Sequence, residues 1–298
     1  MRHVVILVMM VCLMGCHTSY VPPTETVEIP SFETKKPVRI ALVLGGGGAK
    51  GLALLGAIQE LDAAGIKPDL IIGCSAGAMA GALYADGVEN QEFHGMTKQF
   101  LNLKRADFLD FSYLKPLYGL VDVKYLQNIM RSTLKAKRFE ELKIPLIVVA
   151  TDLHTGEVVE ICTGDIACGV GASCAFPGIF KPVQLFGRYL IDGGASCPVP
   201  VSIAKKYGAE VVIAIDVTGK LPATSPQHLI GVGKRSLDIA YRKFVELSLA
   251  QADVVIQMNF EDCGTFTDHM NEQLYEEGRK IIQEQLPEIQ KKLALKLQ

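Results

Sequence analysis

A serine between two glycines stands where an apolar segment gives way to a run of small residues. Ser75 lies between Gly73 and Gly77 in the sequence GCSAG, directly after the apolar residues 70–72. The pattern Gly-x-Ser-x-Gly is typical of a nucleophile elbow, in which a strand turns sharply into a helix and exposes the serine hydroxyl. The other interpretation is a small residue in a tight turn. Because the alanine-rich segment 76–86 has helical character, we expect Ser75 to be a nucleophile.

A second glycine-rich segment, GGGGAKG at residues 45–51, follows the apolar segment 38–44. It contains Gly-x-Gly-x-x-Gly, but the acidic residue that a dinucleotide site needs at the end of the next strand is absent. A P-loop needs Gly-Lys followed by Ser or Thr, whereas Lys50 precedes Gly51 and Leu52 follows it. Both nucleotide-binding interpretations are therefore disfavoured. Backbone amides at such a helix start can hold an oxyanion, and a tight strand-to-helix connection is the alternative.

A serine nucleophile also needs a base, and no histidine lies in a suitable place, because all six lie in the N-terminal segment or in polar, loop-like surroundings. Asp192 follows the short apolar segment RYLI and precedes Gly193 and Gly194, which permit a close backbone approach. Asp152 and Asp216 also end predicted strands, and a turn-forming role applies to all three. Asp192 is the favoured base.

The elements that must position these residues form an alternating pattern of strands and helices. It predicts one α/β domain, with a mostly parallel central sheet flanked by helices on both faces. In such a sheet the glycine loop and Ser75 would meet at the carboxyl edge. The predicted buried strands lie at residues 38–44, 70–73, 146–150, 211–215 and 254–258, and the helical patterns near 50–64, 76–86, 122–135, 198–206, 229–251 and 271–284.

Composition excludes several classes of protein. The 298 residues carry a net charge of −2 and no long basic run, which argues against a nucleic-acid partner. No cysteine or histidine spacing suggests a metal, and we expect no cofactor. Six cysteines lie beyond the N-terminal segment among small or apolar neighbours. Their even number permits disulfides, but free buried thiols are favoured. They are Cys74, Cys162, Cys168, Cys174, Cys197 and Cys263.

The N-terminus has the features of a targeting segment. Residues 4–14 are apolar but too few to span a membrane, which predicts a signal peptide over residues 1–15, with a buried strand or helix as the alternative. The sequence LMGC resembles a bacterial lipobox, which implies lipidation of Cys16 and, since Asp does not follow it, an outer-membrane location facing the periplasm. The polar, proline-containing segment 16–37 predicts a flexible tether and residues 38–298 the catalytic domain.

Three motifs occur in order along the chain: GGGAKG at 46–51, GCSAG at 73–77 and DGG at 192–194. Together with VVATDLHTGEVV at 148–159 and GASCAFPGIFKPV at 171–183, they resemble the patatin-like phospholipase family. The resemblance spans about residues 38–258. It implies an α/β fold with a Ser-Asp dyad and no catalytic histidine.

Site roles follow from this resemblance residue by residue. Ser75 would be the nucleophile, Asp192 the proton acceptor, and the amides of Gly46, Gly47 and Gly48 the oxyanion hole. The motifs also contain Lys50, Gly51, Gly73, Gly77, Gly193 and Gly194. Lys50 stands where the family more often has arginine, and Cys74 replaces a common threonine.

The expected activity is that of a serine esterase of the phospholipase A or lysophospholipase type, which cleaves a membrane lipid through an acyl-enzyme. The alternatives are an acyltransferase with the same dyad and an idle envelope lipoprotein that binds lipid or a partner. Seven aromatic residues lie between positions 93 and 125. One interpretation is an acyl-chain entrance or lid, and the favoured one is a second core cluster. The seven residues are Phe93, Phe100, Phe108, Phe111, Tyr113, Tyr118 and Tyr125.

Overall fold

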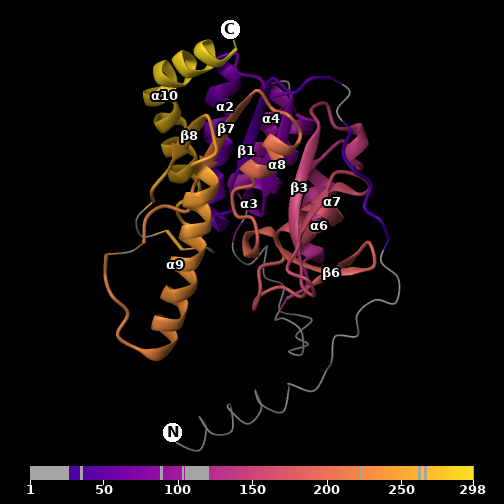
Figure 1. Cartoon of the computed structure of the whole chain (residues 1–298), viewed down its shortest axis with the longest axis vertical. Coiled ribbons are helices and arrows are strands. Elements are labelled where there is room, and N and C mark those ends of the chain that lie inside the picture. Colours follow the sequence, from indigo (N-terminus) through magenta and orange to yellow (C-terminus); the bar gives the residue numbers. More distant parts are fainter. Residues whose placement is uncertain are drawn as a thin grey trace, which may run out of the picture.

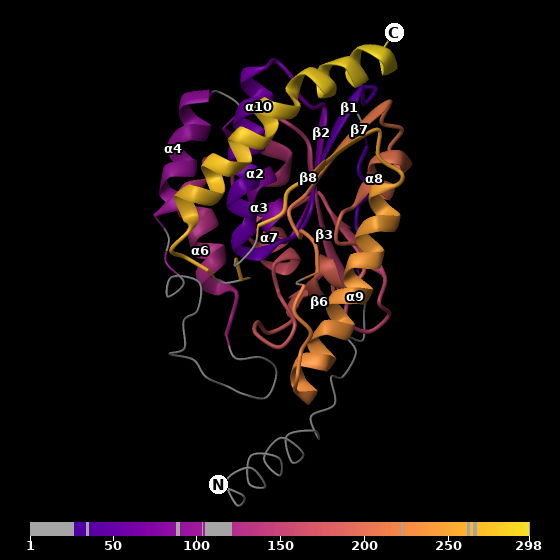
Figure 2. The same cartoon turned by 90° about the vertical axis from the view of Figure 1, so that its left-hand side faces the viewer.

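The computed structural model describes residues 27–33, 36–87, 90–102, 104, 121–221, 223–260, 263–264 and 267–297, and all strands named below belong to one eight-stranded sheet. Helices cover both faces of this sheet (Figure 1, Figure 2). The predicted α/β class is therefore confirmed. The signal peptide predicted over residues 1–15 and the predicted lipidation site Cys16 lie outside the described residues.

Five parallel strands form the main part of the sheet, in the order β3-β2-β1-β7-β8. Every residue of β2, β3 and β7 is buried, as expected where helices cover both faces of a parallel sheet. All five correspond to strands predicted from apolar segments. Their bounds are β1 Ile40–Leu44, β2 Leu70–Cys74, β3 Leu146–Asp152, β7 Val211–Asp216 and β8 Val254–Gln257.

Three short antiparallel strands complete the sheet at the β3 end: β4 (Val158–Ile161), β5 (Val183–Leu185) and β6 (Arg188–Asp192). The sequence predicted the strand before Asp192 but not its antiparallel pairing. Phe186 and Gly187 join β5 to β6, with φ of 52° and 66°. Positive φ at both central residues is characteristic of the tight turns that connect hairpin strands.

The pairing of β3 brings β6 to the end of β2. Cys74 of β2 pairs with Val149, and Asp192 of β6 pairs with the next residue, Ala150. Strand β4 pairs with β3 along residues 148–151 and thus overlaps both of these pairings. Since a strand has only two edges, β2 and β6 follow one another along the same edge of β3. Asp192 therefore lies beside the point at which the chain leaves β2.

The two faces of the sheet carry separate hydrophobic clusters. Leu42 and Leu44 point into the larger cluster, whereas Ala41 and Val43 point into the smaller one. The larger cluster lies under α2 (Leu52–Ala63), α3 (Ala76–Asp86), α4 (Asn90–Leu101), α6 (Lys124–Thr133), α7 (Ile166–Ser173) and α10 (Asn271–Lys296). The smaller lies under α8 (Val201–Lys206) and α9 (Leu229–Leu249). Short 3₁₀ turns occupy Gly48–Gly51, Phe139–Glu141 and Gly193–Ala195.

Helix α10 is longer than its predicted range of 271–284, because it continues through Pro287 to Lys296. A proline in a helix interior removes one backbone hydrogen bond, and α10 continues past it. The helix packs closely across α2. A side chain at Gly56 or Gly278 would clash with the backbone of the opposite helix, and Arg279 pairs with Glu60 at 2.7 Å.

Residues 27–33, which belong to the segment predicted as a tether, lie along the domain. Val27 N–H donates to the carbonyl of Phe186 at 3.2 Å, and the ring of Phe32 packs edge-on against Tyr207 with centroids 5.2 Å apart. Apolar contacts hold this segment against the domain, because Ile29 packs against the larger core cluster and Phe32 against the smaller one. No helix among the described residues is long and apolar enough to cross a membrane.

The aromatic segment divides into two parts. Phe93 and Phe100 are core residues, but they are buried in the larger cluster and not in a second one, whereas Tyr125 is partly exposed. The other four aromatic residues of the set, between 108 and 118, lie outside the described residues. All six cysteines beyond the N-terminal segment are free thiols, as favoured, and all but Cys168 are buried.

Candidate active site

Ser75 occupies a strained turn between β2 and α3. Its φ of 53° is one of two positive values among the described non-glycine residues, and such strain gathers at functional sites. The flanking glycines are needed for this turn. A Cβ at Gly73 would lie 2.5 Å from the carbonyl oxygen of Gly77, and one at Gly77 would clash with the carbonyl of Leu44. The Gly-x-Ser-x-Gly pattern thus lets α3 start directly against the parallel strands.

The structure brings Ser75 and Asp192 into direct contact. Ser75 Oγ donates a hydrogen bond to Asp192 Oδ2 at 2.6 Å. The other carboxylate oxygen, Oδ1, accepts the backbone N–H of Gly194 at 2.7 Å. Only 4% of Asp192 is exposed, and Thr151 Oγ1 donates to its backbone carbonyl at 3.0 Å. The aspartate is therefore fixed on both sides, with one oxygen left facing the serine.

The glycines after Asp192 are required by the same packing. A side chain at Gly193 would clash with the carbonyl of Val149 on β3. A Cβ at Gly194 would lie 3.0 Å from Asp192 Oδ1, the atom that the Gly194 amide now holds. The Asp-Gly-Gly motif is thus explained by the close approach of the loop to β3 and by the turn that cradles the carboxylate.

A serine that the sequence analysis did not single out supports the elbow from α7. Ser173 is fully buried, and its hydroxyl accepts the backbone N–H of Ser75 at 2.9 Å while donating to the carbonyl of Val149 at 2.6 Å. It therefore ties the backbone of Ser75 to β3. The sequence indicates Ser173 only by its place in GASCAFPGIFKPV, a segment of the family resemblance that assigns this serine no role.

The glycine loop, residues 45–51, passes against Ser75, but one of its amides already has a hydrogen-bond partner. A Cβ at Gly46 would lie 3.4 Å from Ser75 Cβ. The backbone N–H of Gly46 donates a hydrogen bond to the carbonyl of Pro198 at 3.0 Å. The resemblance assigned the amides of Gly46, Gly47 and Gly48 to an oxyanion hole, and in the structure the Gly46 amide is engaged by Pro198 instead. The N–H groups of Gly47 and Gly48 make no hydrogen bond within the described chain, because Gly47 caps the 3₁₀ turn Gly48–Gly51 and Gly48 is its first residue, where N–H groups have no partner in the same turn.

The remaining loop residues have structural contacts. Gly48 has φ of 58°, and a side chain at Gly47 or Gly51 would clash with Val217 or Ala76. Lys50 Nζ donates to the carbonyl of Thr218 at 3.1 Å. Lys50 therefore ties the loop to the segment after β7.

Burial sets the electrostatics of the dyad. It raises the pKa of Asp192 to about 6, although the hydrogen bonds from Ser75 and Gly194 lower it. A carboxylate with a raised pKa is a stronger base than an ordinary one and is still mostly ionised at neutral pH. Burial, and then the charge of Asp192, raise the pKa of the Cys74 and Cys174 thiols, so both stay protonated.

The other strand-end aspartates have different partners. Asp152 pairs with Arg188 at 2.9 Å, and Asp216 pairs with Arg242 at 2.7 Å. Both are ion-pairing residues of the fold, so Asp192 is the aspartate that the structure brings to Ser75. Of the histidines at 94, 154, 228 and 269, none hydrogen-bonds to either dyad residue, and His228 caps α9 by accepting the N–H of Gly231.

Tyr241 of α9 also reaches the site, which its place in a helical pattern did not indicate. A Cβ at Gly46 would lie 3.3 Å from the Tyr241 hydroxyl, and one at Gly194 3.4 Å from it. Its hydroxyl thus borders the space between the glycine loop and the dyad. Burial, with smaller contributions from Cys74 and Asp192, raises its pKa well above the ordinary value, so the phenol stays neutral.

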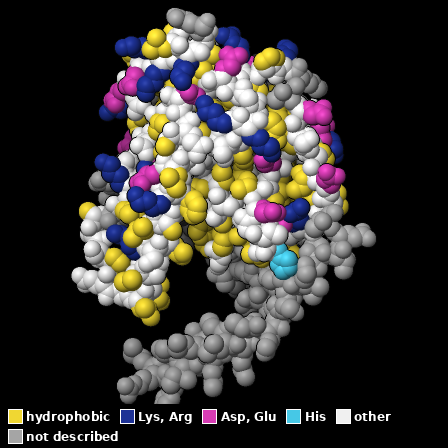
Figure 3. Space-filling view, viewed as in Figure 1, with side chains coloured by type: hydrophobic (Ala, Val, Ile, Leu, Met, Phe, Trp, Pro, Cys, Tyr) yellow, Lys and Arg dark blue, Asp and Glu magenta, His cyan; other side chains and the backbone are white. Residues whose placement is uncertain are grey.

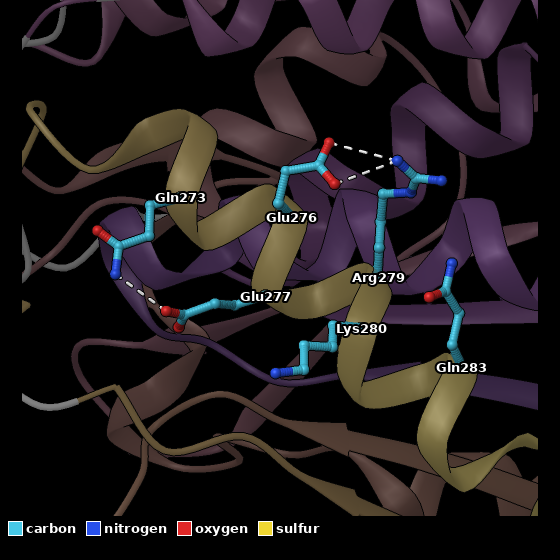
Figure 4. Close-up of a pocket in the computed structure, with 6 residues that line it drawn as sticks. All are labelled: Gln273, Glu276, Glu277, Arg279, Lys280 and Gln283. Carbon is cyan, nitrogen blue, oxygen red and sulfur yellow. Dashed lines mark hydrogen bonds and ion pairs between the residues drawn. The ribbon is translucent and has the colours of Figure 1, made fainter.

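A separate depression lies on α10 and shares no residue with the dyad (Figure 4). Its walls come from one helix face, on which Arg279 pairs with Glu276 and Gln273 with Glu277. Such a helix face offers no enclosure for a substrate. Among the described residues, no three His, Cys, Asp or Glu side chains gather as a metal site.

Comparisons with known proteins identify the family of the chain. A family model for patatin-like phospholipase matches residues 42–205, a segment that contains Ser75, Asp192 and the glycine loop. An uncharacterized NTE family protein of Mycobacterium bovis is 34% identical over 181 residues, 61% of this chain and 49% of that protein. Lysophospholipase NTE1 of Cryptococcus neoformans is 32% identical over 192 residues, 63% of this chain and 12% of that protein. The chain thus spans about half the length of the first relative.

Among solved structures, VipD from Legionella pneumophila aligns with 93% of this chain and 73% of its own, at a TM-score of 0.46 and 15% identity. The family model spans more than half of the chain and includes the elbow, the glycine loop and the Asp-Gly-Gly motif. The chain therefore belongs to the patatin-like phospholipase family.

Proposed function

We propose that this protein is a serine esterase that hydrolyses acyl esters of membrane lipids, as a phospholipase A or lysophospholipase. The observation that carries the proposal is the 2.6 Å hydrogen bond from Ser75 Oγ to the buried carboxylate of Asp192. It lies at a strained elbow beside the amides of Gly47 and Gly48, which have no partner among the described residues. A lysophospholipase among the relatives supports the lipid ester as substrate class.

The first half of the reaction uses groups already in place. Ser75 Oγ attacks the ester carbonyl carbon while Asp192 Oδ2 accepts its proton, and the carbonyl oxygen becomes an oxyanion. The amides of Gly47 and Gly48 stabilise that charge. As the C–O bond breaks, Asp192 returns the proton to the leaving alcohol, and the acyl group remains on Ser75.

The second half repeats the steps with water. Asp192 accepts a proton from the water that attacks the acyl-enzyme, the same amides hold the second oxyanion, and Ser75 regains its proton as the fatty acid leaves. An alcohol in place of water would give acyl transfer. Product analysis with a phospholipid substrate therefore distinguishes free fatty acid from a transferred acyl ester.

The site is tested with a fluorophosphonate, which reacts with activated serines. The wild-type chain should be labelled and should release fatty acid from lipid vesicles, and Ser75→Ala should do neither. Ser196→Ala is the matched control, since Ser196 shares a hydrogen bond with Thr151 rather than with Asp192. An unlabelled, folded wild-type chain in the presence of vesicles would instead favour the idle lipid-binding protein.

The proposal includes a location. The signal peptide over residues 1–15 and the lipobox-like LMGC support lipidation of Cys16 and attachment in a bacterial envelope, facing the periplasm from the outer membrane. Metabolic labelling with an alkyne fatty acid should mark the wild-type chain and not Cys16→Ala. Absence of label on the wild type would contradict the lipid anchor without affecting the esterase.

A further inference from the structure

Helix α9 exposes a continuous apolar stripe that no described residue covers. Its members recur at helical spacing along one side, and we define the stripe by five of them. Their exposed fractions are Leu229 87%, Ile230 82%, Leu237 73%, Phe244 51% and Leu247 67%. Single exposed apolar residues are common on proteins, but a contiguous row marks an interaction surface. We propose that this stripe docks the protein on a lipid bilayer, an inference that rests on the proposed lipid esterase function.

The other side of α9 holds the helix to the body. Val245 and Leu249 are buried in the smaller core cluster. Arg242 pairs with Asp216, the last residue of β7, and also donates to Thr218 Oγ1 at 2.9 Å. The stripe therefore lies on a helix that is fixed in place, with its apolar side facing away from the core.

These contacts also fix where the stripe lies. Arg242 is level with the carboxyl edge of the sheet, where Ser75 lies, and the thirteen residues before it project about 20 Å beyond that edge. Figures 1 and 2 show this lower part of α9 extending past the sheet. Leu229, Ile230 and Leu237 of the stripe lie on this projecting part, whereas Phe244 and Leu247 lie beside the sheet. Tyr241, which borders the site, stands between these two groups. A surface bound to the stripe would lie next to the substrate's entrance.

The side chains of α9 and the position of the N-terminal segment favour a lipid bilayer as the surface that the stripe binds. Helix α9 carries four basic and two acidic residues. Lys234 and Lys243 are exposed and pair with Asp238 and Glu246 of the same helix, whereas Arg242 pairs with the buried Asp216. Hydrophobic and basic side chains lie together on this projecting part in Figure 3. A helix with an apolar stripe flanked by lysine and arginine is typical of membrane-surface binding.

The described chain begins at the same end of the molecule. Val27 bonds to Phe186 at the β5–β6 turn, beyond the carboxyl end of β3. Cys16, the proposed lipidation site, is eleven residues before Val27, which reach at most about 40 Å. A lipid at Cys16 would hold this end of the domain, and therefore the stripe, toward the bilayer.

The absence of tryptophan in the chain permits a direct test. Leu237→Trp places a single fluorophore on the stripe, and Leu295→Trp places one at an exposed leucine of α10 as the matched control. The full chain with Ser75→Ala is mixed with vesicles of equimolar phosphatidylcholine and phosphatidylglycerol. We expect a blue shift and quenching by brominated acyl chains for Leu237→Trp and neither for Leu295→Trp.

Three outcomes would overturn the proposal. They are an unchanged Leu237→Trp emission, an equal response of both variants, and a blue shift before lipid is added that grows with protein concentration. The last would mean that a second copy of the chain covers the stripe. Because this readout needs no turnover, it can succeed or fail independently of the esterase.

A second experiment measures how the stripe affects ester hydrolysis on vesicles and in solution. In the active chain, Leu237→Glu should lower hydrolysis of vesicle lipid roughly tenfold or more, because burying one leucine contributes about that factor to binding. Hydrolysis of a soluble short-chain ester should stay within twofold of wild type. Equal loss on both substrates, or no loss on vesicles, would contradict a docking role, whereas no hydrolysis of any ester by the wild type would contradict the proposed function instead.

An independent observation concerns Tyr241. Its neutral hydroxyl makes no hydrogen bond within the described chain and borders the space between Gly46 and the dyad. We infer that it donates a hydrogen bond to the substrate's carbonyl oxygen as the oxyanion forms, in the place left by the engaged Gly46 amide.

Tyr241→Phe tests this role, because it removes only the hydroxyl. The kcat for a soluble ester should fall at least tenfold with KM within about twofold, since a donor that acts in the transition state affects kcat. Tyr207→Phe, which removes a hydroxyl bound to Glu160 instead, should leave both constants unchanged. An unchanged kcat in Tyr241→Phe would refute the role, and so would a fall matched by Tyr207→Phe.

Discussion

Ser75 and Asp192 stand 117 positions apart in the chain, yet the serine hydroxyl donates to the buried carboxylate at 2.6 Å. Pairing of β3 with β2 and then β6 along one edge creates this contact, because Cys74 and Asp192 oppose consecutive residues of β3. The dyad is thus part of the sheet's own hydrogen-bonding register. This relationship leads to predictions about chemistry, stability and packing.

The first prediction is the pH dependence of the reaction. Asp192 must be ionised to accept the serine proton, and burial raises its pKa to about 6. For a soluble ester, kcat/KM should therefore be constant above about pH 7 and should fall about tenfold per pH unit well below pH 6. A fall centred near pH 4 would mean that Asp192 has an ordinary pKa in the free enzyme.

The second prediction links that pKa to stability. The folded chain binds the Asp192 proton with a pKa of about 6, against 3.8 for an ordinary carboxyl, so the aspartate's contribution to stability falls as pH rises from about 4 to 6. At pH 7, ionisation of the buried Asp192 lowers the free energy of unfolding by about 3 kcal/mol relative to a carboxyl with an ordinary pKa. Asp192→Asn should therefore be inactive but more stable by up to that amount at pH 7, with no gain below about pH 4.

Urea unfolding of wild type and Asp192→Asn at pH 4 and pH 7 measures this difference. Ser196→Ala serves as a control that removes a nearby polar group without changing charge. A variant that is less stable than wild type at both pH values would show that the hydrogen bonds to the carboxylate outweigh its desolvation.

How much of this site the sequence predicted depends on whether a residue carries a local signal. Ser75, Gly47 and Gly193 stand in motifs whose glycines are required by close backbone contacts, so pattern reading finds them. Ser173 lies in a segment of the family resemblance that gave it no role, and Tyr241 lies in an ordinary helical segment. Both make contacts with distant parts of the chain. Their roles follow only from helix packing, which no local pattern encodes.

The same distinction applies to the fold. The buried parallel strands are continuous apolar segments and were predicted, whereas the short strands β4 and β5 contain exposed positions and lack that signal. The engaged amide of Gly46 is a further example. Its partner is the carbonyl of Pro198, which belongs to a different loop, and no motif indicates that contact.

The third prediction concerns Ser173, which positions the nucleophile without touching substrate. Ser173→Ala leaves the Ser75 amide and the Val149 carbonyl without their partner, and each unsatisfied buried group costs about 1–3 kcal/mol. We expect lower stability and at least tenfold slower fluorophosphonate labelling of Ser75. Ser173→Thr, which keeps the hydroxyl, should restore labelling if the hydrogen bond is what matters. Equal labelling rates in wild type and Ser173→Ala would contradict the positioning role.

The last prediction tests why glycine follows Asp192. A methyl group at Gly193 would clash with the carbonyl of Val149, a backbone atom of the central sheet that cannot move aside. Gly193→Ala should therefore lose about 1–3 kcal/mol of stability or more and should separate Asp192 from Ser75, abolishing ester hydrolysis. Gly95→Ala is the matched control, because a methyl group there meets nothing within 4 Å in the helix α4. That variant should keep full activity and gain up to about 1 kcal/mol from helix propensity. An active, stable Gly193→Ala would mean that the loop after β6 has room to shift, and that the register of β6 on β3, rather than the glycine, holds the carboxylate in place.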